Sequence, residues 1–228
     1  MVERFCDEAL WIDEGKILGA GDPRRVVHAY TTDVEKSEER ALAVGDQKVQ
    51  QTLSEPSPDA VPGGIDAPVS TSEPPGDMLR ATQGRWGSGP VRIDTVTLER
   101  DGEETHVFHS GDRLAIRLCV STETTVTDFV FGISIFNAEG VCCYGTNTDI
   151  EEYKSLELVG SGDVIFSIDK LDLVEGTYKL DVAVHTRDGV QYDYHRLLYT
   201  FRVKSSVKDT GVYRPQHAWT FSNNVRFV

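Results

Sequence analysis

The chain has 228 residues, of which 26% are charged and 9% aromatic, and its formal net charge is −14. No apolar run approaches the roughly 20 residues that a membrane span needs, and the acidic opening MVERFCDEAL lacks the pattern of a signal peptide. The acidic charge is spread along the chain without a basic stripe, which argues against nucleic acid as a partner. We therefore expect a cytoplasmic chain.

The cysteines and histidines do not form a metal-binding pattern. Zinc sites need His and Cys side chains at characteristic spacings, and the four cysteines contain no C-x-x-C pair. Cys142 and Cys143 are adjacent, so on a strand they point to opposite faces. The sequence therefore predicts neither a metal site nor a cofactor.

Residues 1–44 form the first of three zones and combine a hairpin with a helix. In FCDEALWIDEGKILGAGDP, two short alternating strands flank a turn at 13–16. Asp22 followed by Pro23 predicts a helix start, with Asp22 as N-cap. Two short strands and a helix cannot bury a core of their own, so this zone is expected to be disordered or to pack opportunistically.

Residues 45–84 form the second zone, which is rich in proline. Six of the nine prolines lie here, among Gly, Ser, Thr and acidic residues. Such a segment cannot bury enough apolar surface to offset its ordering entropy. We expect a flexible, disordered linker.

Residues 85–228 form the third zone, a series of strands separated by turn signals. FVFGISIFNAEGVCCYGTNT contains two strands joined by Asn-Ala-Glu-Gly, and a second long hairpin turns at 187–189. Four strands have alternating core-facing sets: Leu114, Ile116, Leu118 and Val120; Val164, Phe166 and Ile168; Leu180, Val182 and Val184; Leu197, Tyr199, Phe201 and Val203. This pattern predicts an all-β fold, an antiparallel β-sandwich of the immunoglobulin-like or jelly-roll kind.

The two ends of the chain resemble parts of one family of transport proteins. FCDEALWIDEGKILGAGDPRRVVHAY is similar to the closing segment of an ABC-transporter nucleotide-binding domain, with its Cys-Asp pair, two glycines and final tyrosine at Cys6, Gly15, Gly21 and Tyr30. In the third zone RWG, YGTNT and L-x-x-G-T-Y follow in the order found in Wzt proteins. The chain thus resembles the Wzt family, the ATP-binding subunits of O-antigen (lipopolysaccharide) exporters with a C-terminal carbohydrate-binding domain.

The resemblance implies a function in polysaccharide transport. It implies that residues 85–228 recognise the undecaprenyl-linked O-polysaccharide, near its non-reducing end, and present it for ATP-driven export. The implied partners are this polysaccharide, the transmembrane permease subunit and a second copy of the chain, at the cytoplasmic side of the inner membrane. The phosphate-binding pattern GxxxxGK[ST] is missing from the sequence, so we expect a fragment truncated within the nucleotide-binding domain that does not hydrolyse ATP.

Candidate glycan-binding residues are those predicted to face away from the core. Sugar sites combine aromatic faces with planar polar groups. The residues that meet this description are Ser134, Phe136, Tyr144, Asp181, His185, Arg187, Tyr192 and Tyr194. Alternatively, Phe136 and Tyr144 cover a dimer interface or a second core layer.

Two other functions are compatible with a sandwich. A glycoside hydrolase or lyase needs a carboxylate pair with one raised pKa. The acidic run at 149–152 lies in a polar, solvated stretch and is therefore not expected to supply such a pair. A protein-interaction or dimerisation module needs only an exposed strand edge. The C-terminal segment around Trp219, which follows a break at Gly211, could exchange onto a second copy.

Overall fold

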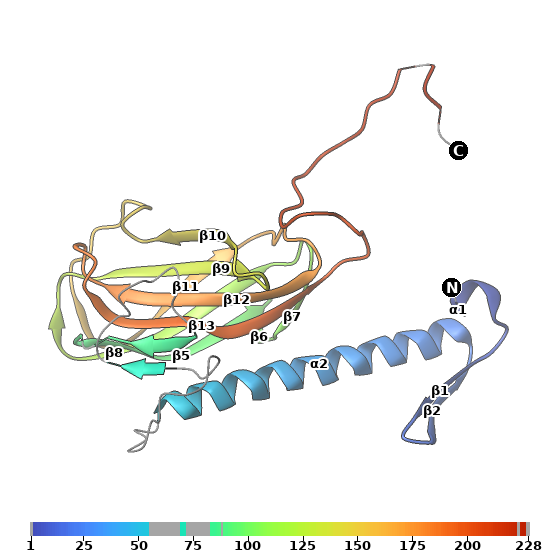
Figure 1. Cartoon of the computed structure of the whole chain (residues 1–228), viewed down its shortest axis with the longest axis horizontal. Coiled ribbons are helices and arrows are strands. Elements are labelled where there is room, and N and C mark those ends of the chain that lie inside the picture. Colours follow the sequence, from blue (N-terminus) through green and yellow to red (C-terminus); the bar gives the residue numbers. More distant parts are fainter. Residues whose placement is uncertain (1, 55–68, 72–82, 88, 223, 227–228) are drawn as a thin grey trace.

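The computed structural model describes residues 2–54, 69–71, 83–87, 89–222 and 224–226 (Figure 1). A small N-terminal hairpin leads through a long helix to a sandwich of two sheets. The N-terminal elements are α1 (Val2–Phe5), β1 (Ala9–Asp13), β2 (Lys16–Gly21) and α2 (Pro23–Ser54). None of the helices in this described part is long and apolar enough to cross a membrane.

The sandwich consists of a larger and a smaller sheet. The larger has the order β10-β9-β12-β13-β4-β3, with β7 also paired to β13, and the smaller has the order β11-β8-β5-β6. The strands of the larger sheet are β3 (Val69–Thr71), β4 (Gly84–Trp86), β7 (Val107–His109), β9 (Val130–Asn137), β10 (Cys142–Asn147), β12 (Gly176–His185) and β13 (Gln191–Lys204). Those of the smaller sheet are β5 (Val91–Arg100), β6 (Glu103–Glu104), β8 (Leu114–Val126) and β11 (Leu158–Ile168).

The pairing is antiparallel except between β13 and β7 and between β3 and β4. The prediction of an antiparallel β-sandwich is therefore confirmed.

The core lies between the two sheets, as the alternation predicts. The sets on β8 and on β12 are at most 1% exposed. Phe201 stacks on Tyr178 and meets Phe108 edge-on, with ring centroids 5.5 and 5.8 Å apart. The predicted set on β11 is partly buried. On β13 the prediction fails at Leu197, which has a φ of 54° at a bulge, so Leu198 is buried in its place.

The N-terminal hairpin is ordered and packs on the start of α2. Glu14 and Gly15 both have positive φ, as a tight two-residue hairpin turn requires. Trp11 meets Tyr30 edge-on at 5.9 Å. Asp22 caps the helix as predicted, because its carboxylate accepts the Arg25 N–H at 3.1 Å. Apolar residues on the hairpin remain more than half exposed, namely Leu10, Ile12, Ile17 and Leu18.

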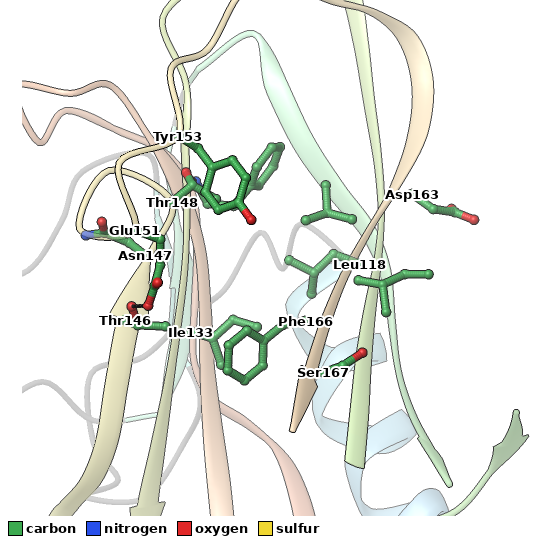
Figure 2. Close-up of a pocket in the computed structure, with 13 residues that line it drawn as sticks. Leu118, Ile133, Thr146, Asn147, Thr148, Glu151, Tyr153, Asp163, Phe166 and Ser167 are labelled. Carbon is green, nitrogen blue, oxygen red and sulfur yellow. Dashed lines mark hydrogen bonds between the residues drawn. The ribbon is translucent and has the colours of Figure 1, made fainter. Parts of the chain in front are cut away.

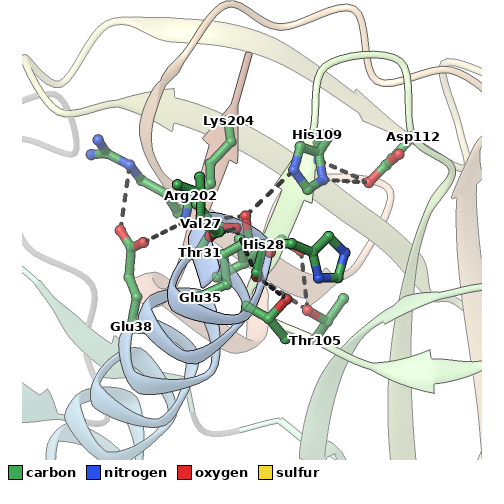
Figure 3. A network of polar contacts seen from close by, with 12 residues as sticks. Val27, His28, Thr31, Glu35, Glu38, Thr105, His109, Asp112, Arg202 and Lys204 are labelled. Atoms are coloured by element: carbon green, nitrogen blue, oxygen red, sulfur yellow. Dashed lines mark hydrogen bonds and ion pairs between the residues drawn. The ribbon is translucent and has the colours of Figure 1, made fainter. Parts of the chain in front are cut away.

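Helix α2 extends to Ser54, so residues 45–54 are helical and the prediction of a linker from residue 45 is wrong there. The helix continues because it docks along β13 and β7 from its middle, at Glu35 and Glu38, to Asp46 in its C-terminal half (Figure 1). In the network of Figure 3, Glu38 contacts Lys204 at 3.0 Å and Arg202 at 3.5 Å. Most of the remaining predicted linker, 55–68 and 72–82, lies outside the described residues.

Asp46 anchors this helix to the sandwich. It is 6% exposed, and its carboxylate accepts the Thr200 N–H at 2.7 Å. Thr200 lies on β13 between the stretches that pair with β4 and with β7. His106 binds the carbonyl of the same residue through Nδ1 at 2.9 Å. Together, Asp46 and His106 satisfy the backbone groups of Thr200 at this gap in the pairing.

We expect Asp46→Ala to lower the free energy of unfolding by about 1–3 kcal/mol, since it leaves a buried N–H without an acceptor. Asp46→Asn keeps an acceptor oxygen and should cost less. Burial raises the pKa of Asp46 above 3.8, so its contribution to stability falls as the pH rises from 3.8 through the raised value. Urea unfolding across this pH window measures both effects. Equal losses for Asn and Ala would show that the charge, and not the acceptor, matters.

Candidate functional site

A small pocket lies on the outer face of the larger sheet, over β9, β10, β12 and β13. We call it the face pocket. Its volume is about 160 Å³, and four of the predicted site residues line it: Ser134, Asp181, His185 and Tyr194. Asp181 and His185 face outward because Val182 and Val184, which alternate with them on β12, are fully buried in the core. The structure thus brings half of the predicted residues together.

Asp181 forms the rigid base of the face pocket. It is 2% exposed and accepts hydrogen bonds from the Tyr194 hydroxyl and the Leu197 N–H, both at 2.7 Å, and from Arg196 at 3.2 Å. Burial raises the pKa of Asp181 despite these donors. Burial and the neighbouring Asp181 carboxylate likewise raise the pKa of Tyr194. With its acceptor oxygens engaged in this way, Asp181 positions Tyr194 and its own role is structural.

His185 and Gln191 bring further polar atoms to the lining of the face pocket. The Nδ1 of His185 lies 2.6 Å from the carbonyl oxygen of Thr186. Because that oxygen can only accept, Nδ1 carries a proton, and Nε2 is the ring nitrogen that remains for a ligand. The Oε1 atom of Gln191 is buried without a partner, and this residue lines the pocket. A buried polar atom left unsatisfied calls for an explanation, such as a ligand.

The sequence prediction missed Gln191 and chose Tyr192 instead. A register shift between Val184 and His185 pairs Gln191 with His185, so Gln191 shares the outer face. Tyr192 packs against the hydrophobic core, and its carbonyl accepts the Gly89 N–H at 3.1 Å. Period-2 alternation alone could not locate this irregularity.

The remaining predicted residues lie outside the face pocket. Phe136 is on the same face, with the Arg196 guanidinium 5.5 Å from its ring centroid. Arg187 lies past the end of β12 and pairs with Asp149 at 3.0 Å. Tyr144 was wrongly placed on the outer face: a register shift in β10 pairs it with Ile135, a core residue, so it faces inward.

A larger cleft opens between the edges of the two sheets, where β10 lies across from β11. We call it the edge cleft, and its volume is about 600 Å³. Figure 2 shows Tyr153 and Glu151, from the loop after β10, across from Leu118 and Asp163. Tyr153 is 70% exposed. Tyr144 lies next to this cleft, stacked on Phe166, one of its lining residues, at 6.3 Å.

The polar rim of the edge cleft is held by local hydrogen bonds. The Thr146 hydroxyl donates to Glu151 at 2.9 Å, and Asn147 Oδ1 accepts the Ile150 N–H at 2.7 Å. Asp163 accepts from Arg117 at 3.2 Å. Within the described parts of the chain, no group of three His, Cys, Asp or Glu side chains is placed to hold a metal ion.

Comparisons with known proteins relate the sandwich to one group of domains. A family model described as the Wzt C-terminal domain matches residues 82–215. The O-antigen export system ATP-binding protein RfbB of Myxococcus xanthus is 29% identical over 219 residues, which cover 96% of this chain and 44% of that protein. The chain thus spans less than half the length of this curated relative.

A solved structure agrees in fold. The crystal structure of the C-terminal domain of Wzt matches with a TM-score of 0.57 at 21% identity, over 61% of this chain and 89% of that one. The resemblance drawn from the sequence motifs is confirmed by the family match.

Proposed function

Because the chain belongs to the family of Wzt C-terminal domains, we propose that its β-sandwich binds the O-polysaccharide carried by an ABC exporter. The observation that carries this proposal is the face pocket. His185 offers an open ring nitrogen there, and Gln191 an unsatisfied buried oxygen. Hydrogen-bonding groups of this kind, held on rigid strands, suit the hydroxyl and amide groups of a sugar.

The wider setting follows from the similarity to an O-antigen export ATP-binding protein. We place the chain at the cytoplasmic side of the inner membrane, in a complex with a transmembrane permease. There it recognises the undecaprenyl-linked polysaccharide, at the non-reducing end, before ATP-driven export. Residues 1–44 then correspond to the closing segment of a nucleotide-binding domain, and the sandwich itself is not the part that hydrolyses ATP.

Dimerisation through the C-terminal segment is a further part of this proposal. Tyr213 forms a bridge with Leu173, which anchors the start of the segment on the sandwich. Beyond it, Trp219 is 79% and Phe221 48% exposed, and their rings stack on each other at 6.4 Å. Exposed aromatic side chains of this kind suit exchange onto a second copy. Light scattering should give the mass of a dimer, and Trp219→Ala should shift the equilibrium towards the monomer.

Titration calorimetry with the O-polysaccharide of the organism that encodes this chain tests the glycan proposal. We expect His185→Ala and Gln191→Ala each to weaken binding roughly tenfold, as the loss of a desolvated hydrogen bond does. Val190→Ala is the matched control, because this residue is 63% exposed on the same hairpin and does not line the face pocket. Its affinity should be that of the unmodified chain.

Removing the terminal cap of the polysaccharide separates two modes of recognition. Binding that requires the cap supports recognition of the chain end, and equal binding places recognition on the repeat unit. A folded chain that binds neither form contradicts the glycan proposal and favours a protein-interaction or dimerisation module. The exposed apolar residues of the loop after β10, among them Ile150 and Leu156, would then be the first surface to test.

A further inference from the structure

We propose that the glycan site continues from the face pocket across strand β10 into the edge cleft, so that it holds a stretch of several uncharged sugar residues. This inference rests on the proposed function and extends it from one pocket to a two-part site. The face pocket takes one sugar residue, and the neighbouring residues of the same chain lie in the edge cleft.

Size is the first argument. Ligand sites in proteins typically enclose about 300–1,000 Å³. The face pocket, at about 160 Å³, lies below this range, whereas the edge cleft, at about 600 Å³, lies well within it. A polysaccharide that touched only the face pocket would leave the larger cavity beside it unused.

Continuity is the second argument. Ile133, Thr146 and Asn147 line both cavities, so a single edge strand and its neighbour separate them. Between the two cavities, β10 has no side chain at Gly145, which pairs with Ser134 in the adjacent strand. A Cβ atom at Gly145 would lie 2.9 Å from the Ser134 hydroxyl. The absence of a side chain there keeps this hydroxyl accessible from the β10 edge.

The chemistry of the edge cleft defines the class of sugar. Its floor is apolar, with Leu118, Val164 and Phe166, and Tyr153 presents an exposed ring on which the C–H face of a pyranose can stack. Its rim carries the carboxylates of Glu151 and Asp163. None of the described residues that line it is Lys, Arg or His. Arg117 pairs with Asp163 at 3.2 Å but does not line the cleft, and Glu151 accepts the Thr146 hydroxyl. A lining of this kind favours hydroxyl donors over carboxylated or phosphorylated sugars.

Calorimetry of the full chain with fragments of different length tests this inference. The probes are mono- and disaccharides from the O-polysaccharide repeat and the intact released polysaccharide. We expect at least a tenfold higher affinity for the long chain, counted per chain end. Tyr153→Ala should weaken binding of the long chain roughly tenfold, the loss expected for one buried stacking contact, and leave binding of the short fragments unchanged.

Leu156→Ala is the matched control, because Leu156 is an exposed apolar residue of the same loop that does not line the edge cleft. Its affinities should match those of the unmodified chain. If the affinity does not depend on the length of the glycan and Tyr153→Ala binds the long chain like the unmodified protein, the two-part site is overturned but the face pocket remains as the glycan site. If the repeat unit bears a uronic acid or a phosphate and its binding still depends on Tyr153, the restriction to uncharged sugars is overturned.

Two further outcomes would also overturn the inference. If Tyr153→Ala lowers the mass seen by light scattering and leaves glycan affinity intact, the edge cleft is a contact between copies of the chain. If the folded chain binds no fragment of any length, the proposed function fails, and the two-part site fails with it.

Discussion

Replacing Asp193 by alanine is expected to lower the free energy of unfolding by about 3–5 kcal/mol, the range found when one partner of a buried ion pair is removed. Asp193 belongs to the larger sheet and is 4% exposed. Its carboxylate accepts two hydrogen bonds from Arg85, at 2.7 and 2.9 Å, and one from the Ile93 N–H in the smaller sheet, at 2.8 Å. The substitution would therefore remove the ion-pair partner of the Arg85 guanidinium and leave the Ile93 N–H without its acceptor.

The pH dependence of this effect has a defined sign. Burial by itself would raise the pKa of Asp193, but the contacts with His195 and Arg85 hold it below its ordinary value of 3.8. A carboxyl group whose folded-state pKa is depressed stabilises the fold above its ordinary pKa, and this stabilisation is lost as the pH falls through the lowered value. The difference between Asp193→Ala and the unmodified chain should thus shrink in acid.

Urea unfolding measures this loss, and Asp163→Ala provides the control. Asp163 also pairs with an arginine, at 3.2 Å, but its side chain is 51% exposed. Exposed ion pairs contribute about 0–1 kcal/mol, so this variant should unfold almost like the unmodified chain. Similar losses for the two variants would contradict the role of Asp193 as a link between the sheets.

Asp181→Ala is expected to destabilise the fold by a similar amount, about 3–5 kcal/mol, and to disturb the face pocket. The substitution removes the acceptor of the Leu197 N–H at the bulge in β13 and of the Tyr194 hydroxyl. It also removes the ion-pair partner of Arg196, whose side chain is 12% exposed. Tyr194 stacks on Trp86 at 5.2 Å, with the rings 6° from parallel, so the near-ultraviolet circular dichroism should change as well.

Two milder variants separate the contributions of Asp181. Asp181→Asn keeps an acceptor for the Leu197 N–H and should lose less stability than Asp181→Ala. Tyr194→Phe removes a single hydrogen bond and should cost about 0.5–1.5 kcal/mol. Since burial raises the pKa of Asp181, the contribution of this residue to stability should fall as the pH rises from 3.8 through the raised value, and the stability difference between the unmodified chain and Asp181→Asn should change over this window. Equal unfolding of the Ala and Asn variants would contradict this account.

Sequence patterns were sufficient for the sandwich core and for local chain reversals. Alternating apolar residues on β8 and β12 identify the buried face, because successive side chains of a strand point to opposite sides. Glu14 and Gly15 occupy the predicted hairpin turn, and Asp22 caps α2. These features depend on residues close together in the chain, so a linear reading finds them.

Helix length and docking depended on distant parts of the chain. Residues 45–54 have the composition of a linker, yet they are helical. Asp46 accepts a hydrogen bond from Thr200, and Val49 packs against the sandwich core. Tertiary contacts of this kind override local propensity, and nothing near Asp46 in the sequence indicates its partner.

The sequence by itself determined the fold class and the family, and four of its candidate residues line the face pocket, while the tertiary structure decided which faces the others occupy. Register shifts in β10 and β13 turn Tyr144 inward and Gln191 outward. Each inserted residue reverses the alternation beyond it, and its position is set by pairing with a neighbouring strand. The edge cleft also depends on the tertiary structure. Its walls come from β10 and β11, which belong to different sheets and lie opposite each other only in the folded sandwich.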